Sequence, residues 1–170
     1  MKHTLRTLLF ASLAAPAFAY SAALNVDIYA VDSDGVGDKL GQIRVHETEH
    51  GTVFTPDLSG LEPGAHGFHV HEHPSCEPKD GKAAGAAGSH YDPKGHGNHA
   101  PPWSEGHLGD LPALYVSEDG KATQPVLAPK IKPEDLKGRA LMLHEGGDNY
   151  SDLPKPLGGG GSRVACGEIK

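Results

Sequence analysis

Basic residues, long apolar segments and cysteines are all scarce in this sequence. Only 15 lysines and arginines stand against 22 aspartates and glutamates, so no basic stripe is available to neutralise nucleic-acid phosphates or to bind an anionic membrane surface. No apolar segment is long enough to cross a bilayer as a helix. We therefore expect no nucleic-acid partner and no membrane insertion of the mature chain. A small anionic substrate remains compatible with this composition, because a local positive field can oppose the net charge.

The clearest apolar run lies near the N-terminus and has the layout of a secretory signal peptide. Two basic residues precede the stretch TLLFASLAA, and the sequence AFA at residues 17–19 offers small residues for cleavage. We predict a signal peptide at residues 1–19, cleaved near Ala19, and one mature domain at residues 20–170. Because residues 1–19 contain two basic residues and no acidic residue, the mature domain has a formal net charge of −9. The alternative is an unprocessed N-terminal helix.

The chain has two cysteines, Cys76 and Cys166. An even number of cysteines in an exported protein favours a disulfide. A bridge between them would close a loop of about 90 residues, which the chain-entropy model values at roughly 4 to 5 kcal/mol. The competing interpretation is a pair of thiolate metal ligands, but no CxxC spacing supports it.

Helical periodicity is also scarce, and short strand-like segments take its place. Seven or eight segments alternate or are rich in β-forming residues; they lie at 24–31, 40–48, 51–58, 64–73, within 113–128, and in GRALMLHEG and SRVACGEI. The 23 glycines and 14 prolines suit turns and loops, and residues 132–138 form the one expected helical turn. This pattern predicts an all-β antiparallel sandwich or flattened barrel. Residues 74–110 and 145–162 form two long loops, which are usually functional in compact domains.

The segment GFHVHEH places histidines at alternate positions, His69, His71 and His73. In a strand, residues two apart share a face. His69 and His71 can therefore approach one ion from the same side. The alternative is a polar strand face in which histidine happens to recur.

The long loop that follows contains most of the remaining histidines. Eight of the twelve histidines lie between residues 66 and 107. The loop candidates are His90, His96, His99, His107 and Asp110. Imidazole suits zinc and copper, and a carboxylate among imidazoles suits zinc. Because the candidates outnumber the ligands of one tetrahedral site, we expect two neighbouring metals.

Five motifs together resemble the bacterial periplasmic copper-zinc superoxide dismutases. They are GFHVHEH, GSHYDP, GHLGDLPAL, LMLHEGGDNYSD and GGGGSRVACG, and the resemblance covers nearly the whole mature chain. It implies an eight-stranded antiparallel Greek-key sandwich or flattened barrel with two long functional loops. It also implies one copper and one zinc per chain, superoxide as the substrate and a periplasmic location. Relatives include monomers and dimers, so a homodimer is one of two states that the resemblance allows.

The resemblance further implies a role for each matching residue. Copper would be held by His69, His71, His90 and His144. Zinc would be held by His90, His99, His107 and Asp110. His90 would thus bridge the two metals, and Asp148 would link a copper-ligand histidine to a zinc-ligand histidine.

The resemblance also places Arg163 beside the open copper position, where it would attract the anion. Arg163 and His90 are therefore the predicted catalytic residues. The disulfide between Cys76 and Cys166 would fix the loop and help to hold Arg163. Two further cations in that loop, Lys79 and Lys82, are candidates for steering the substrate.

One departure from the family pattern concerns the zinc ligands. The spacing from His99 to His107 is eight residues here, often one fewer than in relatives, and His96 is inserted three residues before His99. We favour His99 as the ligand, because it keeps the expected distance from His90 and precedes a proline pair.

Three functions are compatible with these features: a dismutase, a non-enzymatic periplasmic binder of copper or zinc, and a protein-contact module whose histidines bind adventitious metal. Metal storage needs no anion-docking cation such as Arg163. Chance histidine clusters need neither Asp110 nor Asp148. We therefore favour the dismutase.

Overall fold

The computed structural model describes residues 23–170, and the predicted signal peptide at residues 1–19 lies outside the described residues. The strands are β1 (Leu24–Val31), β2 (Val36–Thr48), β3 (Gly51–Ser59), β4 (Gly64–His66), β5 (Phe68–His71), β6 (Leu114–Val116), β7 (Lys121–Ala122), β8 (Val126–Ala128), β9 (Arg139–His144) and β10 (Arg163–Ile169). Three short 3₁₀ helices accompany them: η1 (Gly85–Ala87), η2 (Pro133–Leu136) and η3 (Leu157–Gly159). Within residues 23–170, no helix is both long and apolar enough to span a membrane. The expected helical turn at residues 132–138 corresponds to η2.

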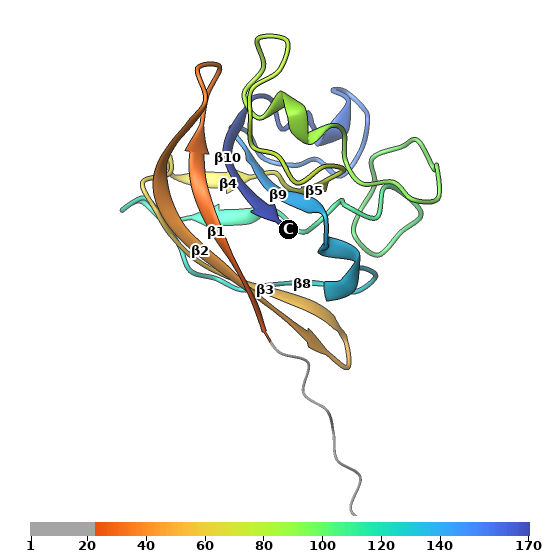
Figure 1. Cartoon of the computed structure of the whole chain (residues 1–170). Coiled ribbons are helices and arrows are strands. Elements are labelled where there is room, and N and C mark those ends of the chain that lie inside the picture. Colours follow the sequence, from red (N-terminus) through yellow and green to blue (C-terminus); the bar gives the residue numbers. More distant parts are fainter. Residues whose placement is uncertain (1–22) are drawn as a thin grey trace, which may run out of the picture.

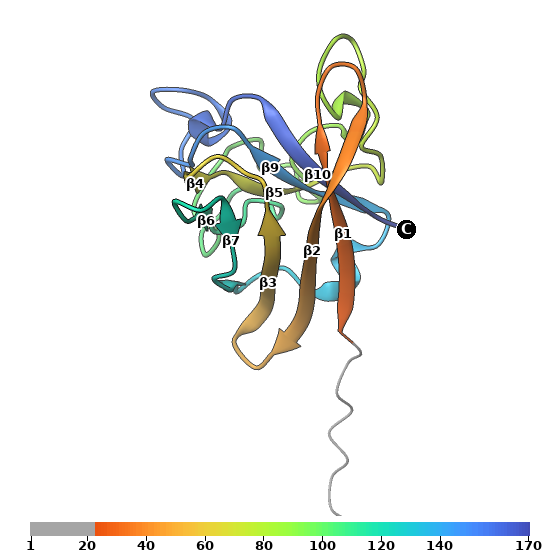
Figure 2. The ribbon, with the colours of Figure 1, turned by 90° about the vertical axis from the view of Figure 1, so that its left-hand side faces the viewer.

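Eight of the ten described strands form one curled antiparallel sheet (Figures 1 and 2). Its order is β5-β9-β10-β1-β2-β3-β7, with β8 also pairing with β3, which makes eight strands. Strands β4 and β6 pair separately. Because β10 returns to lie between β9 and β1, the connections are of the Greek-key type rather than a simple meander. The predicted all-β, eight-stranded antiparallel architecture is confirmed.

Two of the expected strands are split in the structure. The predicted segment 64–73 breaks at Gly67, whose amide N–H donates to the carbonyl of Gly146 and whose carbonyl accepts the N–H of His144. The chain therefore changes partner there, from β6 to β9. The predicted segment 113–128 becomes β6, β7 and β8, because tight turns separate three short pairings.

The inner face of the curled sheet carries the main apolar core. Alternate residues of β1 to β3 point inward, and Phe54 packs edge-on against Phe68 with ring centroids 5.5 Å apart. Strands β5 and β9 are buried on both faces. Their inner residues join the main core, and Met142 joins a second small cluster with Ala84, Ala87 and the two cysteines. This double burial shields the histidines of β5 and β9 from water.

The two long loops lie together on one side of the sheet (Figure 1). The first runs from the end of β5 to the start of β6 and contains η1; the second runs from β9 to β10 and contains η3. Both begin directly after a histidine, because His71 ends β5 and His144 ends β9. The sheet therefore delivers histidines to the place where the loops meet.

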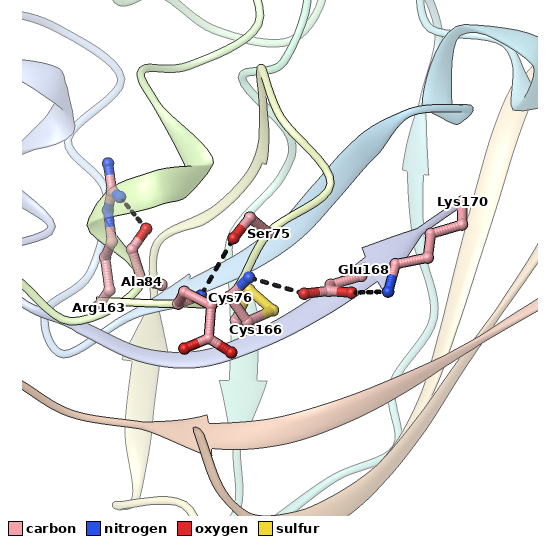
Figure 3. The surroundings of a disulfide bond; sticks show 8 residues. Ser75, Cys76, Ala84, Arg163, Cys166, Glu168 and Lys170 are labelled. Atoms are coloured by element: carbon pink, nitrogen blue, oxygen red, sulfur yellow. Dashed lines mark hydrogen bonds and ion pairs between the residues drawn. A yellow bond between two sulfur atoms is a disulfide. The ribbon is translucent and has the colours of Figure 1, made fainter. Parts of the chain in front are cut away.

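The predicted disulfide is confirmed between Cys76 and Cys166, whose Cα atoms lie 5.7 Å apart. It joins the start of the first loop to β10 (Figure 3). The N–H of Cys76 also donates to the carboxylate of Glu168 at 3.1 Å, and Glu168 pairs with Lys170 at 2.6 Å. The loop is thus anchored to the same strand that carries Arg163.

Candidate metal centre

Four imidazoles meet at the junction of the sheet and the loops. We call His69, His71, His90 and His144 the four-histidine cluster; one ligand atom from each lies within 4.8 Å of the others. Strand β5 supplies two of them, adjacent β9 supplies the third, and the first loop supplies His90. The exposed fractions are 0%, 1%, 3% and 7%, so all four are removed from water.

Each imidazole of the four-histidine cluster has one nitrogen that is engaged in a hydrogen bond. His69 Nε2 donates to Asp148 Oδ2 at 2.8 Å, and His90 Nδ1 donates to Asp110 Oδ1 at 2.9 Å. His71 Nδ1 donates to the carbonyl of Gly88 at 3.0 Å, and His144 Nδ1 to that of Gly161 at 3.2 Å. These partners assign the N–H of each ring.

The second nitrogen of each of these rings is buried without any hydrogen-bond partner: His69 Nδ1, His71 Nε2, His90 Nε2 and His144 Nε2. Buried polar atoms are normally satisfied, so four orphaned nitrogens in one place require an explanation. A metal ion that accepts four lone pairs supplies one. The cluster therefore fits a metal with a preference for imidazole nitrogen.

The protonation of the four-histidine cluster favours lone-pair donation. Burial lowers the pKa of His69 to about 3 and that of His144 to about 4. Burial also lowers the pKa values of His71 and His90. All four rings are consequently neutral at pH 7, which is the state that binds metal.

A second group shares His90 and contains a carboxylate. We call His90, His99, His107 and Asp110 the carboxylate cluster; its ligand atoms also lie within 4.8 Å of one another. Asp110 Oδ1 is 2.9 Å from His90 Nδ1, 3.0 Å from His99 Nδ1 and 3.2 Å from His107 Nδ1. Although His99 Nδ1 is close to that oxygen, its orientation does not make a hydrogen bond, and it is the fifth orphaned nitrogen within the two clusters.

The carboxylate cluster attracts positive charge. Burial opposes protonation of His99, but the carboxylates of Asp110 and Asp148 outweigh it and raise the pKa of His99 to about 9. The hydrogen bond to Asp110 likewise raises the pKa of His107. Burial opposes ionisation of Asp110, yet the three imidazoles hold its pKa well below the usual range. A site that stabilises added protons this way also suits a divalent cation, and this donor set suits zinc.

Asp148 connects the two clusters. Its side chain is fully buried; Oδ2 accepts from His69 at 2.8 Å, and Oδ1 accepts from His99 Nε2 at 2.7 Å. Gly158 packs directly over this pair with φ +74°, and a Cβ there would lie only 2.7 Å from His99 Nε2. Glycine is therefore required at this position, and the second loop closes over the carboxylate.

Arg163 begins β10 and faces the same junction. Its guanidinium donates to the carbonyls of Ala84 and Gly88, each at 2.6 Å, and Figure 3 shows it beside the disulfide-anchored loop. The carbonyl of Gly88 thus accepts from both Arg163 and His71. Because the neighbouring cavity of about 670 Å³ is lined by Arg163 together with three imidazoles of the four-histidine cluster, an anion entering it meets this charge.

The two candidate steering lysines lie on one tight turn of the first loop, where Lys79 and Lys82 exchange backbone hydrogen bonds. Lys82 lines the cavity, whereas Lys79 does not. The tip of the β1–β2 hairpin adds Asp32 and Ser33 to the cavity wall, and Leu157 of η3 forms part of it. The carboxylate of Asp32 is a negative charge at the mouth that the sequence alone did not indicate.

Of the eight histidines between residues 66 and 107, three lie outside both clusters. His73 is exposed, and His96 Nδ1 donates to the carbonyl of Gly106 at 2.8 Å. His66 is buried, with Nδ1 2.6 Å from the carbonyl of His144 and Nε2 2.8 Å from that of Glu62. The sequence analysis assigned no role to His66 or to the carbonyls of Gly88 and Gly161. Both glycines lie in quoted motifs, GSHYDP and GGGGSRVACG, but a motif does not show which backbone carbonyl accepts a hydrogen bond.

Residues 39–169 match the family model described as copper/zinc superoxide dismutase (SODC). Over 157 residues the chain is 54% identical to the superoxide dismutase (Cu-Zn) of Escherichia coli strain K12, covering 89% of this chain and 91% of that protein. The solved Cu/Zn superoxide dismutase from Brucella abortus is 47% identical with a TM-score of 0.84, covering 88% of this chain and 100% of that one. The monomeric copper, zinc superoxide dismutase from Salmonella enterica is 54% identical with a TM-score of 0.78, with the same coverage.

Proposed function

The chain belongs to the copper/zinc superoxide dismutase family, and we propose that its four-histidine cluster holds the copper and its carboxylate cluster the zinc. The family reaction is the dismutation of superoxide, the enzyme is an oxidoreductase, and its cofactors are copper and zinc. The observation that carries the assignment is the set of four orphaned imidazole nitrogens at the four-histidine cluster. Neutral imidazoles without a carboxylate suit copper, whereas three imidazoles with a carboxylate suit zinc.

Copper, when bound, supplies the one-electron exchange by which one superoxide is oxidised to O₂ and a second is reduced, with two protons, to hydrogen peroxide. The chain's own residues hold the ligand nitrogens in a fixed orientation for that exchange. His71 and His144 are held by backbone carbonyls, so their free nitrogens stay aimed at one point. Such preorganisation keeps the ligand set intact without reorganisation during turnover.

We assign His90 to both clusters. Its Nε2 is unpartnered on the side of the four-histidine cluster, and its Nδ1 faces Asp110. One ring can therefore serve two ions, or carry a proton on Nε2 while Nδ1 stays engaged on the zinc side. This arrangement gives His90 a role in proton delivery to the reduced substrate.

We assign Arg163 to anion docking, because its guanidinium stands in the cavity wall with the four-histidine cluster. Arginine keeps its charge at any working pH, so it can hold superoxide without entering the proton transfer. Lys82 and, more remotely, Lys79 extend this positive field to the mouth. Asp148 serves as the carboxylate that orients one ligand of each metal.

We also propose that the chain is exported to the periplasm after cleavage near Ala19. The signal-like composition of residues 1–19 and the disulfide between Cys76 and Cys166 support this proposal, because disulfides persist in oxidising compartments. N-terminal sequencing of the secreted protein tests it; a mature N-terminus at Met1 would contradict it.

The oligomeric state is the last part of the proposal: the mature chain can form a homodimer. Trp103 leaves 67% of its surface exposed in the single chain, so it is available at an interface. One solved relative is described as monomeric, so family membership does not require a dimer. Sedimentation equilibrium of the mature protein distinguishes the two states.

Metal analysis combined with a superoxide assay tests the site assignment. His144→Ala should lose copper and activity while largely sparing zinc. His99→Ala should weaken zinc binding far more than His96→Ala, the matched control. Normal activity of His144→Ala would refute the copper site, and the opposite ranking of the loop variants would refute the choice of His99.

A further inference from the structure

We propose that Asp152 is a positioning residue that ties the backbone of His99 to the cavity wall at Leu157. This inference rests on the proposed function, because it takes the carboxylate cluster as the zinc site. It concerns a carboxylate that is in neither cluster: Asp152 ends the motif LMLHEGGDNYSD, and the sequence analysis gave it no role.

Asp152 uses its two oxygens on two different segments. Oδ2 accepts the backbone N–H of His99 at 2.9 Å, across 53 residues of sequence, and Oδ1 accepts the N–H of Leu157 at 3.0 Å. Hydrogen bonds from backbone N–H groups to a carboxylate are charge-assisted and stronger than those between neutral groups. One side chain therefore joins the first loop to the second.

The bond to His99 determines which histidine faces the zinc site. His99 is held twice from the second loop, at its ring by Asp148 at 2.7 Å and at its backbone by Asp152. His96 lies three residues earlier and its ring is bonded instead to the carbonyl of Gly106. With the amide of residue 99 pinned, the His99 ring projects into the carboxylate cluster and His96 stays outside.

The bond to Leu157 extends the same support to the substrate cavity. Leu157 lines the cavity beside Arg163 and adopts a φ of +54°, a conformation that side chains other than glycine rarely take. Asp152 provides the acceptor for the amide of Leu157 in this conformation. Because coupling between two sites is reciprocal, occupation of the zinc site should steady Leu157, and loosening Asp152 should loosen zinc.

Zinc affinity of the mature, copper-loaded protein, measured by competition with a chelator, is the first test. Asp152→Ala should weaken zinc by about tenfold or more, in the range expected for residues that orient a ligand, with copper affinity unchanged. The zinc affinity of Asp152→Asn should fall between those of the parent and of Asp152→Ala, because its one amide oxygen can accept from one of the two N–H groups. Asn149→Ala is the matched control; its side chain bonds only within the second loop, to Ser151 and Leu153.

Hydrogen exchange at the Leu157 amide is the second readout, since a merely structural role would not link it to zinc. Zinc should slow this exchange in the parent and in Asn149→Ala, and should not slow it in Asp152→Ala. If Asp152→Ala fails to fold, the same comparison is made with Asp152→Asn.

Unchanged zinc affinity in the Asp152 variants would overturn the proposal, as would equal losses in Asn149→Ala. His107→Ala separates this outcome from failure of the proposed function. It must abolish zinc binding if the carboxylate cluster is the zinc site; retained zinc would overturn the site assignment itself.

Discussion

Removing the disulfide should cost the metal-free protein a large part of its stability. Cys76 and Cys166 are 90 residues apart in sequence, and the chain-entropy model assigns a loop of that length about 4.6 kcal/mol. Total domain stability is commonly about 5 to 15 kcal/mol, so the loss is a substantial fraction. Both cysteines are almost fully buried, at 3% and 0% exposure; alanine is therefore the better replacement, because a serine hydroxyl would be buried without a designed partner.

The assay is equilibrium unfolding in urea of the metal-free double variant, in which Cys76→Ala is combined with Cys166→Ala. The oxidised, metal-free parent is the reference. Metals are omitted because a bound ion would add its own stabilisation and break two-state behaviour. We expect a lower midpoint and a free energy of unfolding reduced by roughly 3 to 5 kcal/mol. A loss below about 1 kcal/mol would refute the loop-closure reasoning.

The same variant has a functional consequence. The disulfide anchors the loop whose carbonyls at Ala84 and Gly88 hold Arg163. Once metals are restored, turnover should fall even at temperatures where the fold persists. Full activity in a folded, metal-loaded variant would show that Arg163 is held without the bridge.

Three further predictions concern charge, pH and packing. Arg163→Glu should lower kcat/KM by roughly tenfold or more with metal content intact. The double variant Lys79→Glu with Lys82→Glu should slow turnover mainly below about 0.1 M salt, where the Debye length exceeds roughly 10 Å. A rate that does not vary with salt in any of these proteins would contradict steering. The metal-free protein should lose thermal stability as the pH falls from 7 to 5, because burial lowers the pKa values of the four-histidine cluster (His144 to about 4) while the unfolded imidazoles take up protons near 6.5. The melting temperature of the metal-loaded protein should change much less over this range. Equal dependence of melting temperature on pH in the two forms would refute the argument. Gly167→Ala should destabilise by about 1 to 3 kcal/mol, since its Cβ would lie 2.6 Å from the carbonyl of Asp27; an unchanged melting temperature would contradict this.

Short-range features of the fold were predictable from the sequence because they depend on local periodicity. The alternation in LNVDIYAV predicted β1 at its observed bounds, Leu24–Val31. The division of residues 64–73 at Gly67 was not predictable, because the change of partner depends on hydrogen bonds to Gly146 and His144 in a distant part of the chain.

The metal-binding chemistry was largely visible in the sequence. The HVH alternation put His69 and His71 on one face, and histidines with Asp110 in a glycine-rich loop indicated two metals. Which of those residues meet was supplied by resemblance to a family rather than by spacing. The structure brings the expected residues into two groups that share His90, and the division of copper and zinc between them stays a prediction.

The sequence by itself determined the strand periodicity, the loop composition and the supply of ligand types. Only the tertiary structure decided which nitrogen of each imidazole is free, because that depends on acceptors far along the chain: Asp148 lies 79 residues from His69, and Gly88 lies 17 from His71. It also placed His99, and not His96, in the carboxylate cluster, where carboxylates of the opposite loop hold it. The physical reason is that a ring's tautomer and orientation follow from its hydrogen-bond partner, and long-range hydrogen bonds leave no trace in local sequence pattern.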